Sequence, residues 1–164
     1  MSTMLTLGSQ GRAVRALQTS LNTRFEQLGM IDSMSVQVDG RFDHETLTGV
    51  KYLQCVGGLP VNGQVDLKTQ GFIHHGEAGL ETLAIGSQGT GVMAVQQVLA
   101  SIQIQVETNG CFDELTARGV RIYQQRHGLV ADGTVGLKTW EKVVRSRLQD
   151  LPCLALLPDP YAIA

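Results

Sequence analysis

Residues 39–46 read DGRFDHET, and residues 109–116, 70 positions later, read NGCFDELT. Each stretch opens with an Asx-Gly pair, which favours a tight turn because glycine accepts positive φ and the preceding side chain can hydrogen-bond its own backbone. A phenylalanine follows the turn, where it can plug a small core, and an aspartate then stands where a helix needs an N-cap. These residues are Phe42 and Asp43 in one stretch and Phe112 and Asp113 in the other. The chain therefore predicts the same turn, buried ring and helix start twice.

The repeat extends in both directions from this stretch. Downstream, residues 58–69 and 128–139 share Gly-Leu, an Asx-Gly turn and a closing Leu-Lys-Thr, again 70 positions apart. Upstream, residues 7–18 and 85–96 share a Gly-Ser-Gln-Gly loop followed by a valine and a glutamine, at an offset of 78. Three blocks in the same order indicate tandem copies of one unit. The difference, 78 minus 70, places eight extra residues in the first copy, around residues 25–32.

Helical periodicity fills the segments between the turns. Apolar residues three or four positions apart give a helix one apolar stripe. Such stripes are Val14, Leu17, Leu21, Phe25 and Leu28; Leu47, Val50 and Leu53; Leu115, Val120 and Tyr123; and Leu137, Trp140, Val144 and Leu148. Glycines 57, 58 and 128 are expected to end the middle helices. We predict an all-α fold of two tandem three-helix modules.

The blocks also set the expected boundaries. The first module covers residues 3–75, a linker follows at 76–80, the second module covers 81–149, and a proline-rich apolar tail covers 150–164. Each unit is near the lower size at which a chain folds alone, so packing between the copies is expected to add stability.

Composition excludes several function classes. Hydrophobic residues make up 43% of the chain and charged residues 17%, which excludes a chain too polar to bury a core. The formal net charge of -2 gives no bulk attraction to nucleic acid or to an anionic membrane. No apolar run approaches the roughly 18 residues of a membrane-spanning helix. We expect neither a nucleic-acid partner nor membrane insertion.

The cysteines and the start of the chain bear on location. Cys55, Cys111 and Cys153 are an odd number at unrelated positions, without a metal-binding spacing, so free buried thiols and no cofactor or metal are expected. Residues 1–7 lack the basic and apolar regions of a signal peptide. The sequence taken literally predicts a cytoplasmic protein, whereas a trimmed chain or another export route would give a periplasmic or wall-associated one.

Together the blocks resemble the peptidoglycan-binding domain found in many bacterial wall hydrolases. That pattern runs Leu-Gly, Gly, Val, Leu-Gln, Asp-Gly-x-Phe-Gly, Thr, Phe-Gln, Gly-Leu, Asp-Gly and Thr. The second copy matches at Gly86, Gly89, Val92, Gln96, residues 109–112, Thr116, Val120, Gln124, residues 128–129, residues 132–133, Val135 and Thr139. The first copy matches at Gly8, Gly11, Val14, residues 17–18, residues 39–42, Thr46, Val50, Gln54, residues 58–59, residues 62–63 and Thr69. This chain departs from the family pattern in two places. Asp43 and Asp113 replace a glycine, and the first copy has Gln70 at the position where the second has Trp140.

The resemblance implies non-covalent binding of wall peptide or glycan by a non-catalytic protein. It implies a cleft between the Asx-Gly loop and the middle helix, where amides meet a peptide and an aromatic ring adds a flat apolar wall. The candidate contact residues are Asp39, Arg41, Tyr52, Gln54, Asn109, Tyr123, Gln124 and Trp140. Five of these residues have a structural alternative. Asp39 and Asn109 can serve as turn formers, and Tyr123, Gln124 and Trp140 can be core residues with a polar tip.

An enzyme is the less favoured interpretation. His74 and His75 precede Glu77, but adjacent histidines point in different directions and no third metal ligand has a fitting position. We interpret them as part of a solvent-facing linker. Ser9 and Ser87 lie in glycine-rich loops without a partner base.

The main alternative is an intracellular protein-interaction or scaffolding role for the same fold. The tail supports it, because it is too interrupted by proline to form a helix yet apolar enough to need a partner. Its residues are Leu151, Pro152, Leu154, Leu156, Leu157, Pro158, Pro160 and Tyr161. The same tail would also fit a segment that folds back between the two copies.

Overall fold

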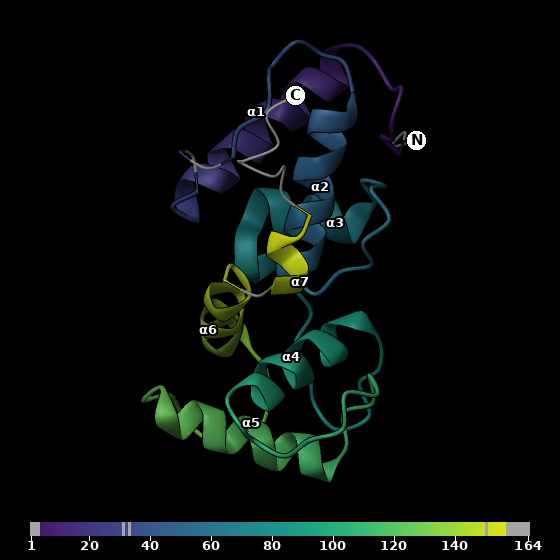
Figure 1. The fold of residues 1–164 in the computed structure, drawn as a ribbon. Helices are drawn as coiled ribbons and strands as arrows, with labels where there is room; N and C mark the ends of the chain where they lie inside the picture. The colour runs from purple at the N-terminus through teal and green to yellow at the C-terminus, as the bar shows by residue number, and fades with distance from the viewer. Residues whose placement is uncertain (1–3, 31, 33, 150, 157–164) are drawn as a thin grey trace.

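The computed structural model describes residues 4–30, 32, 34–149 and 151–156 (Figure 1). The first module contains α1 (Arg12–Gln27), α2 (His44–Val56) and α3 (Leu67–His75), and the second contains α4 (Thr90–Ser101), α5 (Glu114–Arg126) and α6 (Leu137–Arg147). A 3-10 helix, η1 (Gly76–Gly79), lies between them, and α7 (Leu151–Leu154) follows α6. No β-strand occurs among the described residues, so the predicted all-α fold of two three-helix modules is confirmed.

Isolated β-bridges show that the two modules are tied together internally in the same way. In each module the loop before the first helix pairs with both of the Asx-Gly turns. The pairs are Leu5–Val65 and Gln10–Arg41 in the first module, and Leu83–Val135 and Gln88–Cys111 in the second. The partners correspond at the offsets of the sequence repeat, so the repeat in sequence is also a repeat in topology.

Aspartate caps explain where three of the helices begin. The Asp43 carboxylate accepts a hydrogen bond from the Thr46 amide at 2.9 Å, and Asp113 accepts one from Thr116 at 2.8 Å. Asp66 caps α3 in the same way. Each cap satisfies one amide of a first helical turn, which otherwise lacks a partner. The predicted helix starts at Asp43 and Asp113 are confirmed.

The apolar stripes form one continuous core. Val14, Leu21 and Phe25 of α1 are fully buried, and the two rings after the Asx-Gly turns, Phe42 and Phe112, are 2% exposed. The expectation is wrong for Leu115 and Leu137, which are 44% and 46% exposed. Both lie in the first turn of their helices, outside the stretch that packs on the neighbouring helices.

The extra residues of the first copy lengthen α1 and form the loop after it. The helix α1 has 16 residues, whereas its counterpart α4 has 12. The added turn carries Arg24 and Phe25, which are both buried, and the loop after it buries Met34 and Val36. The insertion therefore enlarges the core of the first module.

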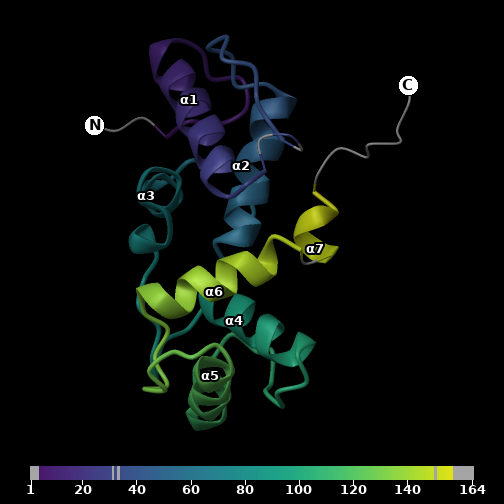
Figure 2. The same cartoon turned by 90° about the vertical axis from the view of Figure 1, so that its left-hand side faces the viewer.

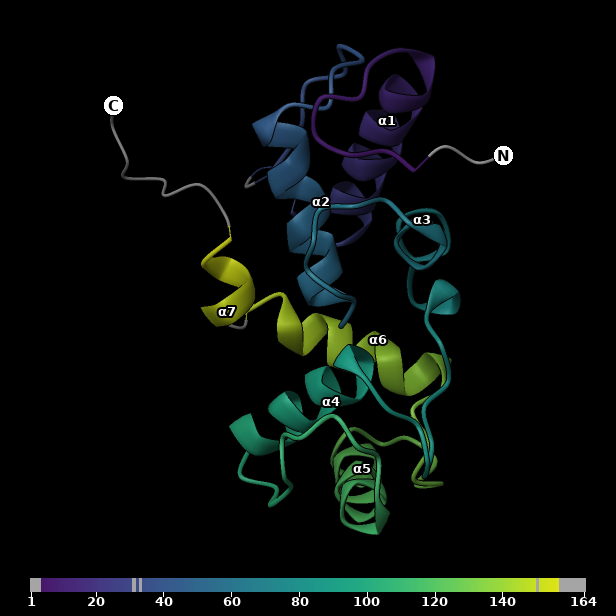
Figure 3. The same cartoon turned by 90° about the vertical axis from the view of Figure 1, so that its right-hand side faces the viewer.

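The helix α6 runs across the boundary between the modules (Figure 2). It contacts α2 and η1 of the first part of the chain and α4 of its own module. Close backbone approach is possible because Gly58, with φ of 66°, has no side chain: a Cβ there would lie 2.8 Å from that of Ala94 on α4. The view from the other side shows the same order, with α6 between α2 and α4 (Figure 3).

The segment expected to be a linker is packed. Gly79 lies so close to Gly71 that a side chain at Gly79 would collide with the Gly71 carbonyl, and η1 contacts both α3 and α6. His74 and His75 are exposed as expected, but they form the last turn of α3 and do not belong to a linker.

A disulfide overturns part of the cysteine expectation. Cys55 on α2 is bonded to Cys153 on α7, 98 positions later in sequence, and their Cα atoms are 5.6 Å apart. Only Cys111 is a free thiol among the described residues, and it is exposed. Spacing along the chain could not show this pair, because the second module brings the two cysteines together.

The tail begins with a helix, contrary to expectation. Proline lacks an amide hydrogen, but the first turn of a helix tolerates it, and Pro152 stands in the first turn of α7. The helix packs against α2. Leu157, Pro158, Pro160 and Tyr161 lie outside the described residues.

Candidate functional site

Each Asx-Gly turn is held by a buried glutamine. In the first turn, the Gln18 side-chain amide donates to the Asp39 carboxylate at 3.0 Å, to the Arg41 carbonyl at 2.9 Å and to the Thr46 hydroxyl at 3.1 Å. Its carbonyl oxygen accepts from the Gly40 amide at 2.8 Å. Because Gln18 is only 1% exposed, these bonds satisfy polar groups that water cannot reach.

The same arrangement, here called the glutamine clamp, occurs four times among the described residues. Every clamp joins a glutamine, an Asx-Gly turn and the threonine of the following helix. The other three are Gln54 with Asn62, Gly63, Gln64 and Thr69; Gln96 with Asn109, Gly110, Cys111 and Thr116; and Gln124 with Asp132, Gly133, Thr134 and Thr139. Each module thus contains two clamps, and its middle helix takes part in both.

The clamps place two of the candidate contact residues in the interior. Gln54 and Gln124 are each 1% exposed, and the donors and acceptors of their amides are used within the clamps. A peptide would have to break these bonds to reach either side chain. Their clearest role is to fix the turns.

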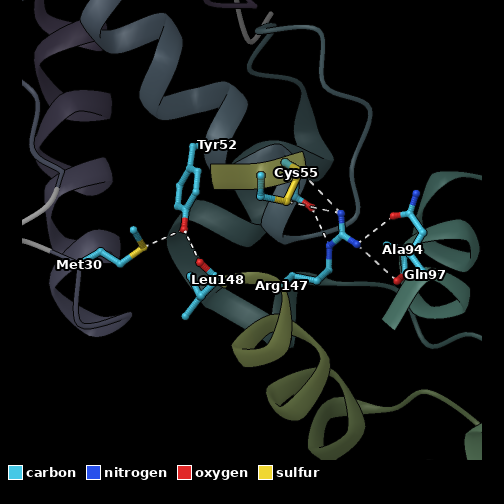
Figure 4. Close-up of a disulfide and its surroundings, with 8 residues drawn as sticks. Met30, Tyr52, Cys55, Ala94, Gln97, Arg147 and Leu148 are labelled. Carbon is cyan, nitrogen blue, oxygen red and sulfur yellow. Dashed lines mark hydrogen bonds between the residues drawn. A yellow bond between two sulfur atoms is a disulfide. The ribbon is translucent and has the colours of Figure 1, made fainter. Parts of the chain in front are cut away.

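The two tyrosines are also interior residues. The Tyr52 hydroxyl lies 2.9 Å from the Met30 sulfur and 3.3 Å from the Leu148 carbonyl, and burial raises its pKa to about 12 (Figure 4). Burial also raises the pKa of Tyr123, whose hydroxyl lies 3.4 Å from the Ser146 hydroxyl. Both rings support the packing of a helix against its neighbours.

Asp39, Arg41 and Asn109 remain at the surface of their turns. The Asp39 carboxylate accepts from the amides of Gln18 and Arg41, and these hydrogen bonds lower its pKa. The Asn109 side chain accepts from the Cys111 amide at 2.9 Å and donates to Glu107 at 3.1 Å. Both therefore act as turn formers, the structural alternative that the sequence left open.

Trp140 is the candidate residue that lines a cavity between the modules. The cavity has a volume of about 320 Å³. The indole nitrogen donates to the Glu81 carbonyl at 2.8 Å, and the ring is 2% exposed. Its Cη2 edge lies beside two glycines, 3.6 Å from where a Cβ on Gly58 would be and 3.9 Å from one on Gly91. Because neither glycine has a side chain, the backbones of the two modules approach each other closely beside the ring.

The cavity combines an apolar wall with polar groups. Leucines 59, 80 and 83 and Pro60 line it together with Trp140. Lys68 and Glu81, 2.8 Å apart, form an ion pair at its edge, with side chains 60% and 66% exposed. The start of α4 also faces it, and Gly89 gives that helix no side-chain cap. The first amides of a helix have no partner within it, so they are available to an acceptor on a ligand.

The chain matches the family model of the peptidoglycan-binding domain at residues 10–73 and again at residues 88–143. It belongs to this family. Both modules are therefore peptidoglycan-binding domains, in tandem, and the resemblance of the sequence blocks to that family is confirmed.

Individual relatives agree with the family. The chain is 28% identical over 167 aligned residues to the N-acetylmuramoyl-L-alanine amidase CwlL of Bacillus licheniformis, covering 86% of this chain and 45% of the amidase. The chain thus spans less than half the length of that relative. It is also similar to a peptidoglycan-binding protein from Clostridioides difficile, solved in complex with glutamine hydroxamate. That similarity amounts to 31% identity over 41% of this chain and 42% of the other, with a TM-score of 0.39.

The peptidoglycan-binding modules bring together residues that sequence reasoning missed. Gly58 and Lys68 of the first module meet Glu81, Gly91 and Trp140 of the second only because the two modules pack together. One signal was available, since Gly91 stands inside a helix where no turn or positive φ requires glycine. Among the described residues, no group of His, Cys, Asp and Glu side chains has the arrangement of a metal site. No described helix is long and apolar enough to cross a bilayer.

Proposed function

We propose that this chain binds the peptidoglycan of a bacterial cell wall without cleaving it, through the cavity between its two modules. The observation that carries the proposal is the pairing of two peptidoglycan-binding domains around a cavity of about 320 Å³ that neither module forms alone. That volume lies at the lower end of the range of ligand pockets, about 300–1,000 Å³.

The cavity suits a wall peptide or glycan. Leu59, Leu80 and Pro60, which line the cavity together with the buried ring of Trp140, offer apolar surface to a sugar face or to a methyl group. Lys68 and the uncapped start of α4 offer positive charge and amide donors to a carboxylate. Asp39 and Arg41 in a turn of the first module, and Asn109 in the equivalent turn of the second, are further candidate contacts for the same ligand.

We further propose that the chain works outside the cytoplasm, at the wall. Disulfides persist in oxidising compartments and are rare in the cytosol. The bond between Cys55 and Cys153 therefore favours an exported protein over the cytoplasmic one that the start of the sequence suggests.

Sedimentation with purified insoluble peptidoglycan tests the proposed site. The informative variant is Gly91→Leu, because a Cβ at this helical position makes only ordinary contacts, the closest at 3.7 Å to Leu83, and the rest of the side chain extends toward Trp140. The matched control is Ala100→Leu, on the exposed face of the same helix. Trp140→Ala is unsuitable, because truncating a buried tryptophan costs about 3–5 kcal/mol of stability.

The parent and the Ala100→Leu variant are expected to sediment with peptidoglycan, and Gly91→Leu at least tenfold less. A parent that stays in the supernatant would refute wall binding and favour the protein-interaction role. Equal sedimentation of all three proteins would refute the site but not the function. Release of soluble sugar or peptide from the wall by the parent would refute binding without cleavage.

A further inference from the structure

A second cavity, of about 200 Å³, lies where the end of α1 meets η1 and α6. Four of its lining side chains are charged: Arg24 on α1, Glu77 on η1, and Glu141 and Arg145 on α6. Leu28 and Leu148 add apolar surface. Like the first cavity it is formed by both modules, but its lining is mainly charged.

Arg24 is the unusual member of this set. It stands in the added turn of α1, where the equivalent position of the second module is Ile102, and its side chain is only 7% exposed. Burial lowers its pKa, and the nearby negative charge of Glu77 opposes that shift. A charge is rarely buried to this extent unless it is paired.

The known contacts of Arg24 use only part of its guanidinium. Its Nε donates to the Ile73 carbonyl at 3.2 Å, and its plane stands 5.9 Å from the centre of the Phe72 ring. These contacts explain why an arginine packs on the end of α3, since a cation favours a helix C-terminus. They leave the two terminal nitrogens, Nη1 and Nη2, without a hydrogen bond in the described part of the chain. Neither nitrogen is sealed from solvent, and Arg24 lines the cavity.

The terminal nitrogens form a fork that matches a carboxylate, which it can bind with two parallel hydrogen bonds. Acceptors for a positively charged group are present in the same cavity. The Glu77 side chain makes no hydrogen bond or ion pair in the described residues. Glu141 pairs with Lys138 at 3.3 Å, an exposed contact of the kind that contributes little. With two arginines and two glutamates, the lining has no net charge.

We propose that this cavity binds a small zwitterion, a free α-amino acid, with its carboxylate on the Arg24 guanidinium and its ammonium between Glu77 and Glu141. The volume, about 200 Å³, is below that of pockets for drug-sized molecules and fits a ligand of this size. The mixed lining selects a ligand that carries both charges, because a simple anion would leave the glutamates unpaired. The site is separate from the cavity beside Trp140 and does not depend on peptidoglycan binding.

Titration with alanine, followed by amide chemical shifts in ¹H–¹⁵N NMR spectra of the full chain, tests the site. Acetate and methylamine, each carrying one of the two charges, are the ligand controls. The variants are Glu77→Gln, which removes the negative charge nearest to Arg24 in the cavity, and Arg24→Lys, which keeps a charge but not the fork. Glu26→Gln, an exposed change on the same helix, is the matched control, and circular dichroism checks that each variant is folded.

Alanine is expected to give saturable shifts around Arg24 and Glu77, with at least tenfold weaker effects from acetate and methylamine. Glu77→Gln should weaken alanine binding at least tenfold, and Glu26→Gln should leave it unchanged. Should Arg24→Lys fail to fold, Glu77→Gln decides the question alone. Equal binding of acetate and alanine, unchanged binding by folded Glu77→Gln, or no saturable shift would each overturn the proposal.

Discussion

At the scale of single residues, the glutamine clamps connect sequence to fold most directly. Each clamp satisfies one buried side-chain amide, a turn glycine and a helix threonine together. The glycines of the clamps have φ between 74° and 81°, a region that L side chains rarely adopt. The motif of Asx-Gly and a threonine six residues after the glycine is therefore a folding element with four copies, although its residues are the ones that the family resemblance places near a ligand.

Removing one clamp glutamine should be strongly destabilising. We expect Gln54→Leu to lower the free energy of unfolding by about 3 kcal/mol, because the buried Gly63 amide loses its acceptor and the Gln64 carbonyl loses its shorter hydrogen bond. Asn62→Asp, in the same clamp, should change it by less than about 0.5 kcal/mol, since Asp39 and Asp132 accept the same bond in other clamps. Urea unfolding measures both. A loss below 1 kcal/mol for Gln54→Leu would mean that the clamp is not structural.

The same residues show what the sequence could not decide. The pattern predicted Phe42 and Phe112 as core plugs correctly, because only one environment suits a phenylalanine after such a turn. Gln124, Tyr123 and Trp140 have a polar tip, which serves equally for an internal hydrogen bond and for a ligand. Which of these two roles the polar tip takes depends on partners that are distant in sequence. Ser146 lies 23 residues from Tyr123, and Glu81 lies 59 residues from Trp140.

At the scale of elements, the start of α6 differs from the other helices that follow an Asx-Gly turn. An aspartate caps α2, α3 and α5, whereas Gly136 stands at the N-cap of α6 and offers no side-chain acceptor. Its backbone angles, φ of -90° and ψ of -170°, resemble those of Asp66, at φ of -78° and ψ of -179°. No atom lies within 4 Å of the place that a Cβ would take. The position is therefore open to a side chain.

We expect Gly136→Asp to stabilise the protein by supplying the missing cap. The carboxylate can accept from the Thr139 amide as Asp66 does from Thr69. Such a cap is worth a few tenths of a kcal/mol over glycine and about 1 kcal/mol over alanine, or about 2–4 °C in Tm between the aspartate and alanine variants. Gly136→Ala is the matched control, because it adds a Cβ without an acceptor. Differential scanning calorimetry measures both variants. If the aspartate and alanine variants have the same Tm, the stabilisation does not come from capping.

The positions of the six main helices along the chain were more predictable from the sequence than the packing of the shorter segments. Turn, cap and periodicity all lie within about ten residues of each other, so local sequence determines them. Packing of η1 and α7 was not predictable, because both depend on surfaces supplied by α6 and α2. Local sequence shows glycine in one segment and proline in the other, and both residues are typical of irregular chain.

At the scale of the whole molecule, three kinds of contact hold the modules together around the end of α2. Arg147 of α6 is 4% exposed and donates to the Cys55 carbonyl at 2.9 Å and to Gln97 of α4 at 3.1 Å (Figure 4). The Tyr52 hydroxyl reaches the Leu148 carbonyl, just beyond α6. The disulfide between Cys55 and Cys153 then closes the chain around the second module. Gly57, two residues after Cys55, lines the cavity beside Trp140, so the shape of the cavity depends on this junction.

Breaking the disulfide should loosen the junction and lower the stability of the whole protein. A bond that closes a loop of about 100 residues reduces the entropy of the unfolded chain, and native disulfides of this kind stabilise by about 2–4 kcal/mol. We therefore expect the Cys153→Ser variant and the parent reduced with dithiothreitol to have the same urea midpoint, and this midpoint should be lower than that of the oxidised parent. Cys111→Ser is the control, since Cys111 is exposed and unpaired. If dithiothreitol shifts the Cys153→Ser variant as much as the parent, or shifts neither, the two cysteines are not joined in the folded protein.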